Sequence, residues 1–68
     1  MNLPMADHRL LRLKEVLTRT GISRATVYRL IARGEFPRPT HVTPHASRWV
    51  DREIDAWIDD RVIDRDMA

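Results

Sequence analysis

Residues 13–33 read LKEVLTRTGISRATVYRLIAR, a stretch that predicts two helices joined by one tight turn. In its first half, side chains that can pack recur at i, i+3, i+4 and i+7: Leu13, Val16, Leu17 and Thr20. This spacing predicts a helix that begins near Lys14 and buries one side. Gly21 predicts its end, because only glycine takes a positive φ without steric cost.

The second half of the stretch predicts a second helix. Ile22 is the apolar residue of the turn, and Ser23 is a strong N-cap whose hydroxyl can accept from the backbone N–H of Ala25 or Thr26. Val27, Leu30 and Ile31 then follow with helical spacing. Burying them against the first helix turns four side chains outward: Arg24, Tyr28, Arg29 and Arg33.

Two short helices joined by a glycine-containing turn, the second opening with polar and basic residues, are typical of a helix-turn-helix. In that motif the second helix enters the major groove of DNA. The alternative is a plain helical hairpin in a small bundle, with its arginines facing solvent.

Composition limits the class of protein. The chain has 68 residues, enough for one small domain with little room for a catalytic cleft. It has no cysteine, so neither a disulfide framework nor a thiolate metal site is expected. Its first residues lack a secretory signal, and no apolar segment approaches the roughly 20 residues that span a bilayer. We therefore expect a cytoplasmic protein without a membrane partner, associated with the nucleoid when bound to DNA.

Charge is distributed unevenly along the chain. Residues 1–50 hold nine basic and three acidic residues, a sum of +6, whereas residues 51–68 hold three basic and seven acidic residues, a sum of −4. Such asymmetry indicates a polyanion partner on one face. Eleven of the twelve cations are arginine, which binds phosphate and guanine edges bidentately, although codon bias accounts for part of that preference.

The flanks of the stretch add short elements. Residues 1–8 are expected to form a flexible leader, and residues 9–13 a short extended segment. Gly34 is a second glycine stop, and Phe36 is the apolar anchor of a chain reversal that ends in two prolines.

Residues 40–50 predict a β-hairpin, with strands at 40–42 and 47–50 around a turn at 43–46. Val42 and Trp49 are expected to pack together on the helices. Thr43, His45 and Arg48 are expected on the other side or at the tip. A hairpin that follows a helix-turn-helix is a wing.

A third helix follows. Asp51 is expected to cap it. Its inward stripe, at helical spacing, comprises Ile54, Trp57, Ile58 and the pair Arg61 and Val62, of which only Arg61 is not apolar. Trp49 and Trp57 are predicted core residues. Residues 64–68 are expected to fray. The whole predicts a mainly α winged helix-turn-helix domain at residues 9–65, with three helices, a small hairpin and a frayed end at 66–68.

The run RLLRLKEVLTRTGISRATVYRLIARGEFPRP at 9–39, followed by SRWVDREIDAWI at 47–58, resembles the AlpA family of prophage regulatory proteins. This family lies within the MerR-like and excisionase-like winged helix-turn-helix domains. The resemblance implies a small DNA-binding protein of bacterial or phage origin that regulates prophage genes, commonly an integrase or excision gene. Some relatives are directionality factors that bend attachment-site DNA. The chain departs from the family in the wing, where Thr43, Pro44 and His45 stand where members often carry glycine and arginine.

Roles follow from position. Arg24 or Arg29 is assigned to guanine, and Tyr28 to a phosphate or a thymine methyl group. Ser23 and Thr26 are candidates for phosphate contacts at the helix N-terminus, although capping explains Ser23 equally well. Arg33, Arg38 and Lys14 are expected to contact the DNA backbone or to be solvated. Arg48 is expected either to contact a phosphate from the wing or to form a salt bridge with the acidic third helix. The predicted DNA-binding residues are Ser23, Arg24, Thr26, Tyr28, Arg29, Arg33, Arg38, Thr43, His45 and Arg48.

Other site types find little support. His41 and His45 lack a third metal ligand nearby, and no nucleophile, base and orienting group come together, so we expect neither a cofactor nor catalysis. The acidic third helix is either a solvated face or a surface that docks on the basic face of a neighbouring copy, or on another protein, when several copies line up on DNA.

The sequence thus favours a sequence-specific regulator of prophage or mobile-element genes that binds double-stranded DNA. One alternative is an excisionase that acts with an integrase or another phage protein. The alternative of another class is a protein-interaction adaptor without DNA binding.

Overall fold

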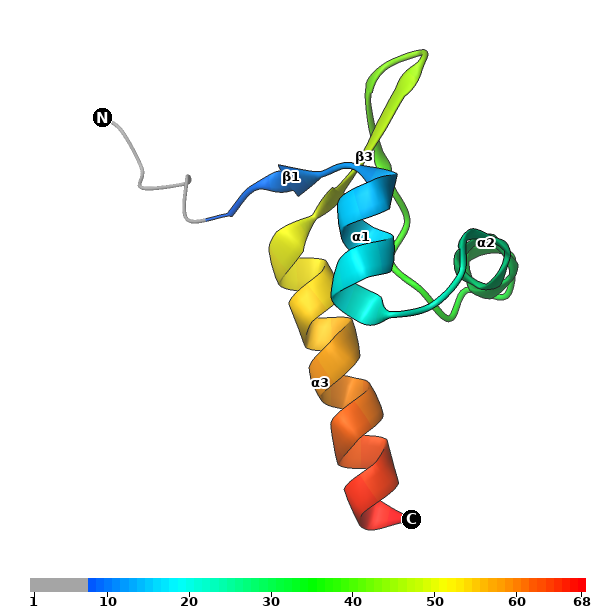
Figure 1. Cartoon of the computed structure of the whole chain (residues 1–68), viewed down its shortest axis with the longest axis vertical. Coiled ribbons are helices and arrows are strands. Elements are labelled where there is room, and N and C mark those ends of the chain that lie inside the picture. The colour runs from blue at the N-terminus through cyan, green and yellow to red at the C-terminus, as the bar shows by residue number, and fades with distance from the viewer. Residues whose placement is uncertain (1–7) are drawn as a thin grey trace.

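The computed structural model describes residues 8–68, which form three helices and a three-stranded sheet (Figure 1). Their order is β1 (Leu10–Leu11), α1 (Leu13–Thr20), α2 (Arg24–Ala32), β2 (Thr40–Thr43), β3 (Ala46–Val50) and α3 (Asp51–Met67). The predicted class, a mainly α winged helix-turn-helix with a small hairpin, is confirmed. The predicted leader lies outside the described residues except for His8, which is exposed. The domain limits at residues 9 and 65 stay predictions.

Local rules set the turn between α1 and α2. Gly21 ends α1 with φ 74°, and its N–H donates to the carbonyl of Leu17 at 2.8 Å. This is the αL termination that glycine permits. Ser23 caps α2, with its Oγ accepting from the backbone N of Thr26 at 3.2 Å. The predicted stop and the predicted cap are both confirmed.

Gly34 ends α2 and redirects the chain. At φ 72° its N–H donates to the carbonyl of Ile31 at 3.0 Å, and the N–H of Glu35 donates to the carbonyl of Leu30 at 2.8 Å. These two bonds form a Schellman motif, which satisfies the last carbonyls of the helix. The chain therefore leaves α2 in a fixed direction.

The sheet has the strand order β1-β3-β2, with both pairs antiparallel. Leu10 lies opposite Val50 and Leu11 opposite Trp49, so part of the extended segment predicted at residues 9–13 is an edge strand. The prediction is too long at its end, because Leu13 already begins α1. The turn end of the β2–β3 hairpin projects away from the helices, while the other end of β3 packs on them through Trp49 (Figure 1). The hairpin is the predicted wing.

One prediction about the hairpin is wrong. Val42 does not pack on the helices with Trp49, because its side chain is 55% exposed, whereas Trp49 is fully buried. The pairing register shifts between His41 and Thr43, so the alternation of faces that the prediction assumed is interrupted at Val42.

The core collects one residue from every element except β2, and one more, Phe36, from the segment between α2 and β2. Its members are Leu11, Val16, Val27, Phe36, Trp49 and Ile54. Leu13, Leu17 and Leu30 are among the partly buried residues that pack against them. Because the domain is small, each element depends on the others for its buried face.

Both tryptophans bind the segment between α2 and β2, residues 33–39, which we call the link. The Trp49 indole N–H donates to the carbonyl of Pro37 at 3.0 Å, and the Trp57 indole N–H donates to the carbonyl of Glu35 at 2.8 Å. Between these carbonyls, Phe36 is buried, with its ring edge-on to Trp57 at 4.9 Å between centroids. The link is therefore bonded to β3 and to α3 at once.

Helix α3 differs from its prediction at both ends. Val50 rather than Asp51 occupies the N-cap position. Asp51 is the first helical residue, and its backbone N donates to the carbonyl of Arg9 at 2.9 Å. Pairing with the chain before β1 therefore sets where α3 begins.

Ile54 is buried, but Val62 is 43% exposed, because α3 extends beyond the other elements (Figure 1). Residues 64–68 are expected to fray, and in the structure the helix continues through them to Met67, with ion pairs along its last turns. Fraying of residues 66–68 in solution stays a prediction.

We predict that Gly34→Ala lowers the free energy of unfolding by about 1–2 kcal/mol, the cost of a left-handed backbone for a residue with Cβ. No atom lies within 4 Å of the added Cβ, so the loss reflects backbone strain alone. Urea unfolding measures it. Glu35→Ala, at an exposed neighbour with ordinary φ, is the control, and equal stability of the two variants would contradict the role of Gly34.

We also predict a pH dependence centred on Glu15. The backbone N–H of Arg12 donates to its carboxylate at 3.0 Å, and this bond, with the nearby Arg9 guanidinium at 3.4 Å, holds the pKa of Glu15 below its ordinary value. The carboxylate therefore contributes stability that is present above a pH of about 4.3 and is lost as the pH falls through the lowered pKa.

Thermal melting of the wild type and Glu15→Gln across this acidic range measures the effect. The difference in melting temperature should shrink as the pH falls. The pKa of Asp51 is lowered too, because backbone hydrogen bonds to Arg9 and Arg52 outweigh the opposing effect of desolvation, but that carboxylate is common to both proteins and cancels. A difference independent of pH would contradict the assignment.

Candidate nucleic-acid interface

The outward side of α2 carries the basic residues that the sequence placed there. Four exposed side chains lie on it: Arg24, Tyr28, Arg29 and Arg33. Val27 on the opposite side is fully buried. Figure 1 shows α2 end-on at the edge of the molecule, well apart from the far end of α3. This helix face is therefore open to a large partner.

A chain of hydrogen bonds runs along the first turns of α2. Ser23 Oγ donates to Thr26 Oγ1 at 2.9 Å, and Arg29 Nη2 donates to the same oxygen at 3.4 Å. Thr26 Oγ1 thus accepts two bonds, which leaves its own proton to donate outward. Because Ser23 Oγ gives its proton to Thr26, the free donors of this Ser23–Thr26–Arg29 row are the Thr26 hydroxyl and the Arg29 guanidinium. The groups they complement are acceptors such as phosphate oxygens or the N7 and O6 of guanine.

Tyr28 joins this face to the sheet. Its ring lies edge-on to Trp49, with centroids 6.4 Å apart, while the residue remains 42% exposed. One part of the ring is supported by the core and another part faces solvent. Sequence reasoning treated Trp49 only as a core residue and missed this support, which depends on contact between residues far apart in the chain.

The wing residues form a separate group. Thr43 and His45 are exposed near the hairpin turn, where Thr43 Oγ1 accepts from the backbone N of His45 at 3.2 Å. Figure 1 shows this tip at a distance from α2. The structure therefore gathers Ser23, Thr26 and Arg29 but does not bring the two wing residues to them.

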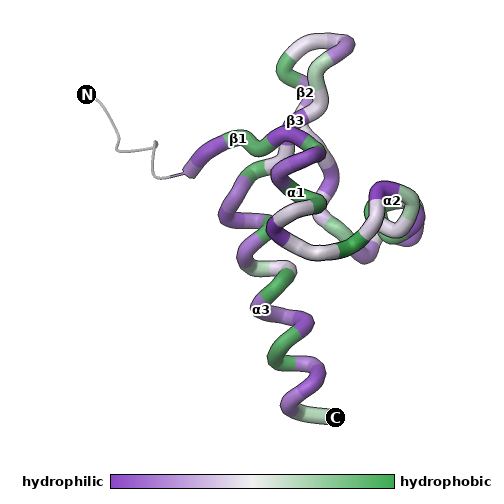
Figure 2. The backbone as a smooth tube through the Cα atoms, viewed as in Figure 1, coloured by the Kyte–Doolittle hydropathy of each residue, from purple (hydrophilic) through white to green (hydrophobic). Residues whose placement is uncertain are grey.

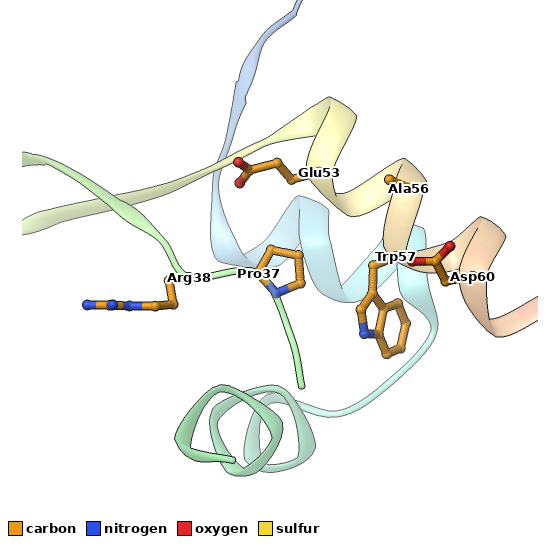
Figure 3. Close-up of a pocket in the computed structure, with 6 residues that line it drawn as sticks. All are labelled: Pro37, Arg38, Glu53, Ala56, Trp57 and Asp60. Atoms are coloured by element: carbon orange, nitrogen blue, oxygen red, sulfur yellow. The ribbon is translucent and has the colours of Figure 1, made fainter. Parts of the chain in front are cut away.

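Two further predicted residues lie between α2 and the wing tip. Arg38 is exposed on the link (Figure 3), and Arg48 is half-buried in β3, with its Nη1 donating to the carbonyl of Ser47 at 2.9 Å. Within residues 8–68 Arg48 makes no ion pair with α3, so the salt bridge considered for it is not formed there.

A cleft of about 480 Å³ lies between the link and α3 (Figure 3). Its lining comprises Pro37, Arg38, Glu53, Ala56, Trp57 and Asp60. The Trp57 N–H is already bonded to the carbonyl of Glu35.

Among residues 8–68, no group of three or more potential ligands that could hold a metal ion is found. The same part of the chain has no helix long and apolar enough to cross a membrane.

Comparison with known proteins connects this architecture to a family. The family model described as "Prophage CP4-57 regulatory protein (AlpA)" matches residues 9–62, which run from the residue before β1 into the exposed part of α3. The chain belongs to the AlpA family. This confirms the resemblance seen in the sequence, and it makes the protein a member of a family of phage regulatory proteins.

A relative of this AlpA-family chain comes from Enterobacteria phage P4. Its "Uncharacterized protein ORF88" is 38% identical over 66 residues, which cover 96% of this chain and 75% of the phage protein. No solved structure matches the chain. The helices, the link and the hairpin therefore all lie within a stretch of sequence that a phage protein shares.

Proposed function

We propose that this AlpA-family protein binds double-stranded DNA sequence-specifically, with α2 in the major groove, and that it regulates transcription of prophage or mobile-element genes. The observation that carries the proposal is the exposed basic face of α2, with donors at Thr26 and Arg29 that the Ser23–Thr26–Arg29 hydrogen bonds hold in place. A helix with this face, fixed on a packed core, fits the groove of a duplex.

Each side chain has a proposed role. Arg29 donates to guanine, positioned by Thr26, and Arg24 binds a neighbouring base or phosphate. Tyr28, supported by Trp49, contacts a phosphate or a thymine methyl group. The remaining proposed contacts are to the DNA backbone: Ser23, Arg33, Arg38, Thr43, His45 and Arg48. We propose no catalytic role, in keeping with a family of regulatory proteins, and we place the protein in the cytoplasm with the DNA.

A second candidate is an excisionase that bends attachment-site DNA in concert with an integrase. The separation of the wing tip from α2 favours it, because a duplex that touches both surfaces is easier to accommodate when bent (Figure 1). Such bending costs energy that added phosphate contacts repay. The two candidates share the same interface and differ in the DNA site that they occupy.

Selection of host genome fragments on the purified protein, at near-physiological salt, distinguishes the two. Enrichment of a promoter upstream of an integrase or excision gene supports the regulator, and enrichment of an attachment site supports the excisionase. Affinity for the enriched fragment should fall steeply as salt rises, since bound phosphates release counterions. An interaction adaptor would enrich nothing over input.

We predict that Arg29→Ala weakens binding to the enriched site by about 1–3 kcal/mol and relaxes the preference at one base position, because a bidentate guanine contact is lost. Fluorescence anisotropy on single-base variants of the site measures both effects. Arg9→Ala is the matched control, since Arg9 is exposed before β1, lies outside α2 and the hairpin, and pairs with Glu15. Equal loss on all duplexes would make Arg29 a phosphate contact, and no loss would remove it from the interface.

A further inference from the structure

The outer half of α3, residues 59–67, is not buried by any other part of residues 8–68. Every residue in this range is exposed, and its large apolar side chains are Val62, Ile63 and Met67, at 43%, 51% and 82% exposure. Figure 2 shows hydrophobic and hydrophilic residues alternating along α3 well beyond the other elements. A helical segment of this length gains little stability from intrinsic propensity and depends on packing against a partner. Exposed apolar side chains on such a segment therefore indicate an interaction surface.

Acidic groups surround this apolar surface. Asp59 and Asp60 precede Ile63 by four and three residues, so helical geometry places them on either side of its face. Neither makes an ion pair within residues 8–68, whereas Asp55, earlier in α3, pairs with Arg19 of α1 at 2.9 Å. The outer half of α3 thus presents exposed apolar groups between unpaired carboxylates.

A complementary surface lies on α1. A groove of about 390 Å³ is lined by Lys14, Glu15, Thr18 and Arg19. The Lys14 side chain is exposed and has no ion-pair partner in the part of the chain that the structure describes. None of the lining residues belongs to α2 or to the hairpin, which hold most of the proposed DNA contacts. Lys14, which the sequence left as either a DNA-backbone contact or a solvated cation, is assigned to this groove instead.

We propose that the outer half of α3 docks in the α1 groove of a second copy, head to tail. The two basic residues and one acidic residue of the groove sum to +1, and the four aspartates and two arginines of residues 59–67 sum to −2, so this arrangement brings opposite charges together. Pairing two α3 ends with each other would instead oppose like charges. A head-to-tail contact leaves one free α3 and one free groove, so it extends to further copies and makes the filling of adjacent DNA sites cooperative.

A charge swap tests the contact without DNA, by sedimentation of the free protein. Asp60→Lys and Lys14→Asp should each weaken self-association roughly tenfold, within the range measured for contacting charged residues. The double variant should recover it, because every copy then carries a reversed but matched pair. Glu53→Lys, the same charge change in the first half of α3, is the control and should leave association unchanged.

Binding to DNA gives the second readout, with one mixed-sequence duplex that holds a single copy and a longer one that holds several. Cooperativity on the long duplex should follow the same pattern across the variants. Affinity for the short duplex tests only the proposed DNA binding. If the protein does not bind that duplex, the proposed function fails, and the sedimentation experiment still tests the contact between copies. Absence of self-association in the wild type, or a double variant no better than either single variant, would overturn the proposal.

Discussion

The fold depends on two indole hydrogen bonds that hold one short link. Trp49 donates to the carbonyl of Pro37 from β3, and Trp57 donates to the carbonyl of Glu35 from α3. With Phe36 buried between these two carbonyls, the segment that leaves α2 is fixed to two elements at once. Loss of either bond would leave a backbone carbonyl of the link without its indole partner and loosen the mounting of α2.

This mounting connects stability to function. Because the link and Val27 hold α2 by one side, the other side is free to present Arg24 and Arg29 to a partner. The Ser23 cap serves both purposes, since it satisfies an end of the helix and begins the hydrogen-bonded row that leads through Thr26 to Arg29. The acids gather on α3 instead, where they do not oppose an anionic ligand of α2.

Local chemistry made much of this predictable from sequence. Gly21, Ser23 and Gly34 act through their own backbone or side chain, so the limits of α1 and α2 follow from residue type. The exposure of Val42 was not predictable, because a register shift between strands decides it. The two indole bonds join residues 12 and 22 positions apart, and periodicity carries no signal for such contacts. The DNA contacts of α2 stay predictions, and the exposure of Arg24, Tyr28, Arg29 and Arg33 is compatible with them.

The most direct test of the account is an NMR titration of isotope-labelled protein with a short duplex that holds one copy. The account predicts that the largest amide shifts occur in α2, residues 23–33, with smaller shifts in the hairpin and little change at the end of α3. Saturation should weaken as salt is added. Shifts confined to α1 or α3, or the absence of saturable shifts at any salt concentration, would contradict the claim that α2 is the surface that reads DNA.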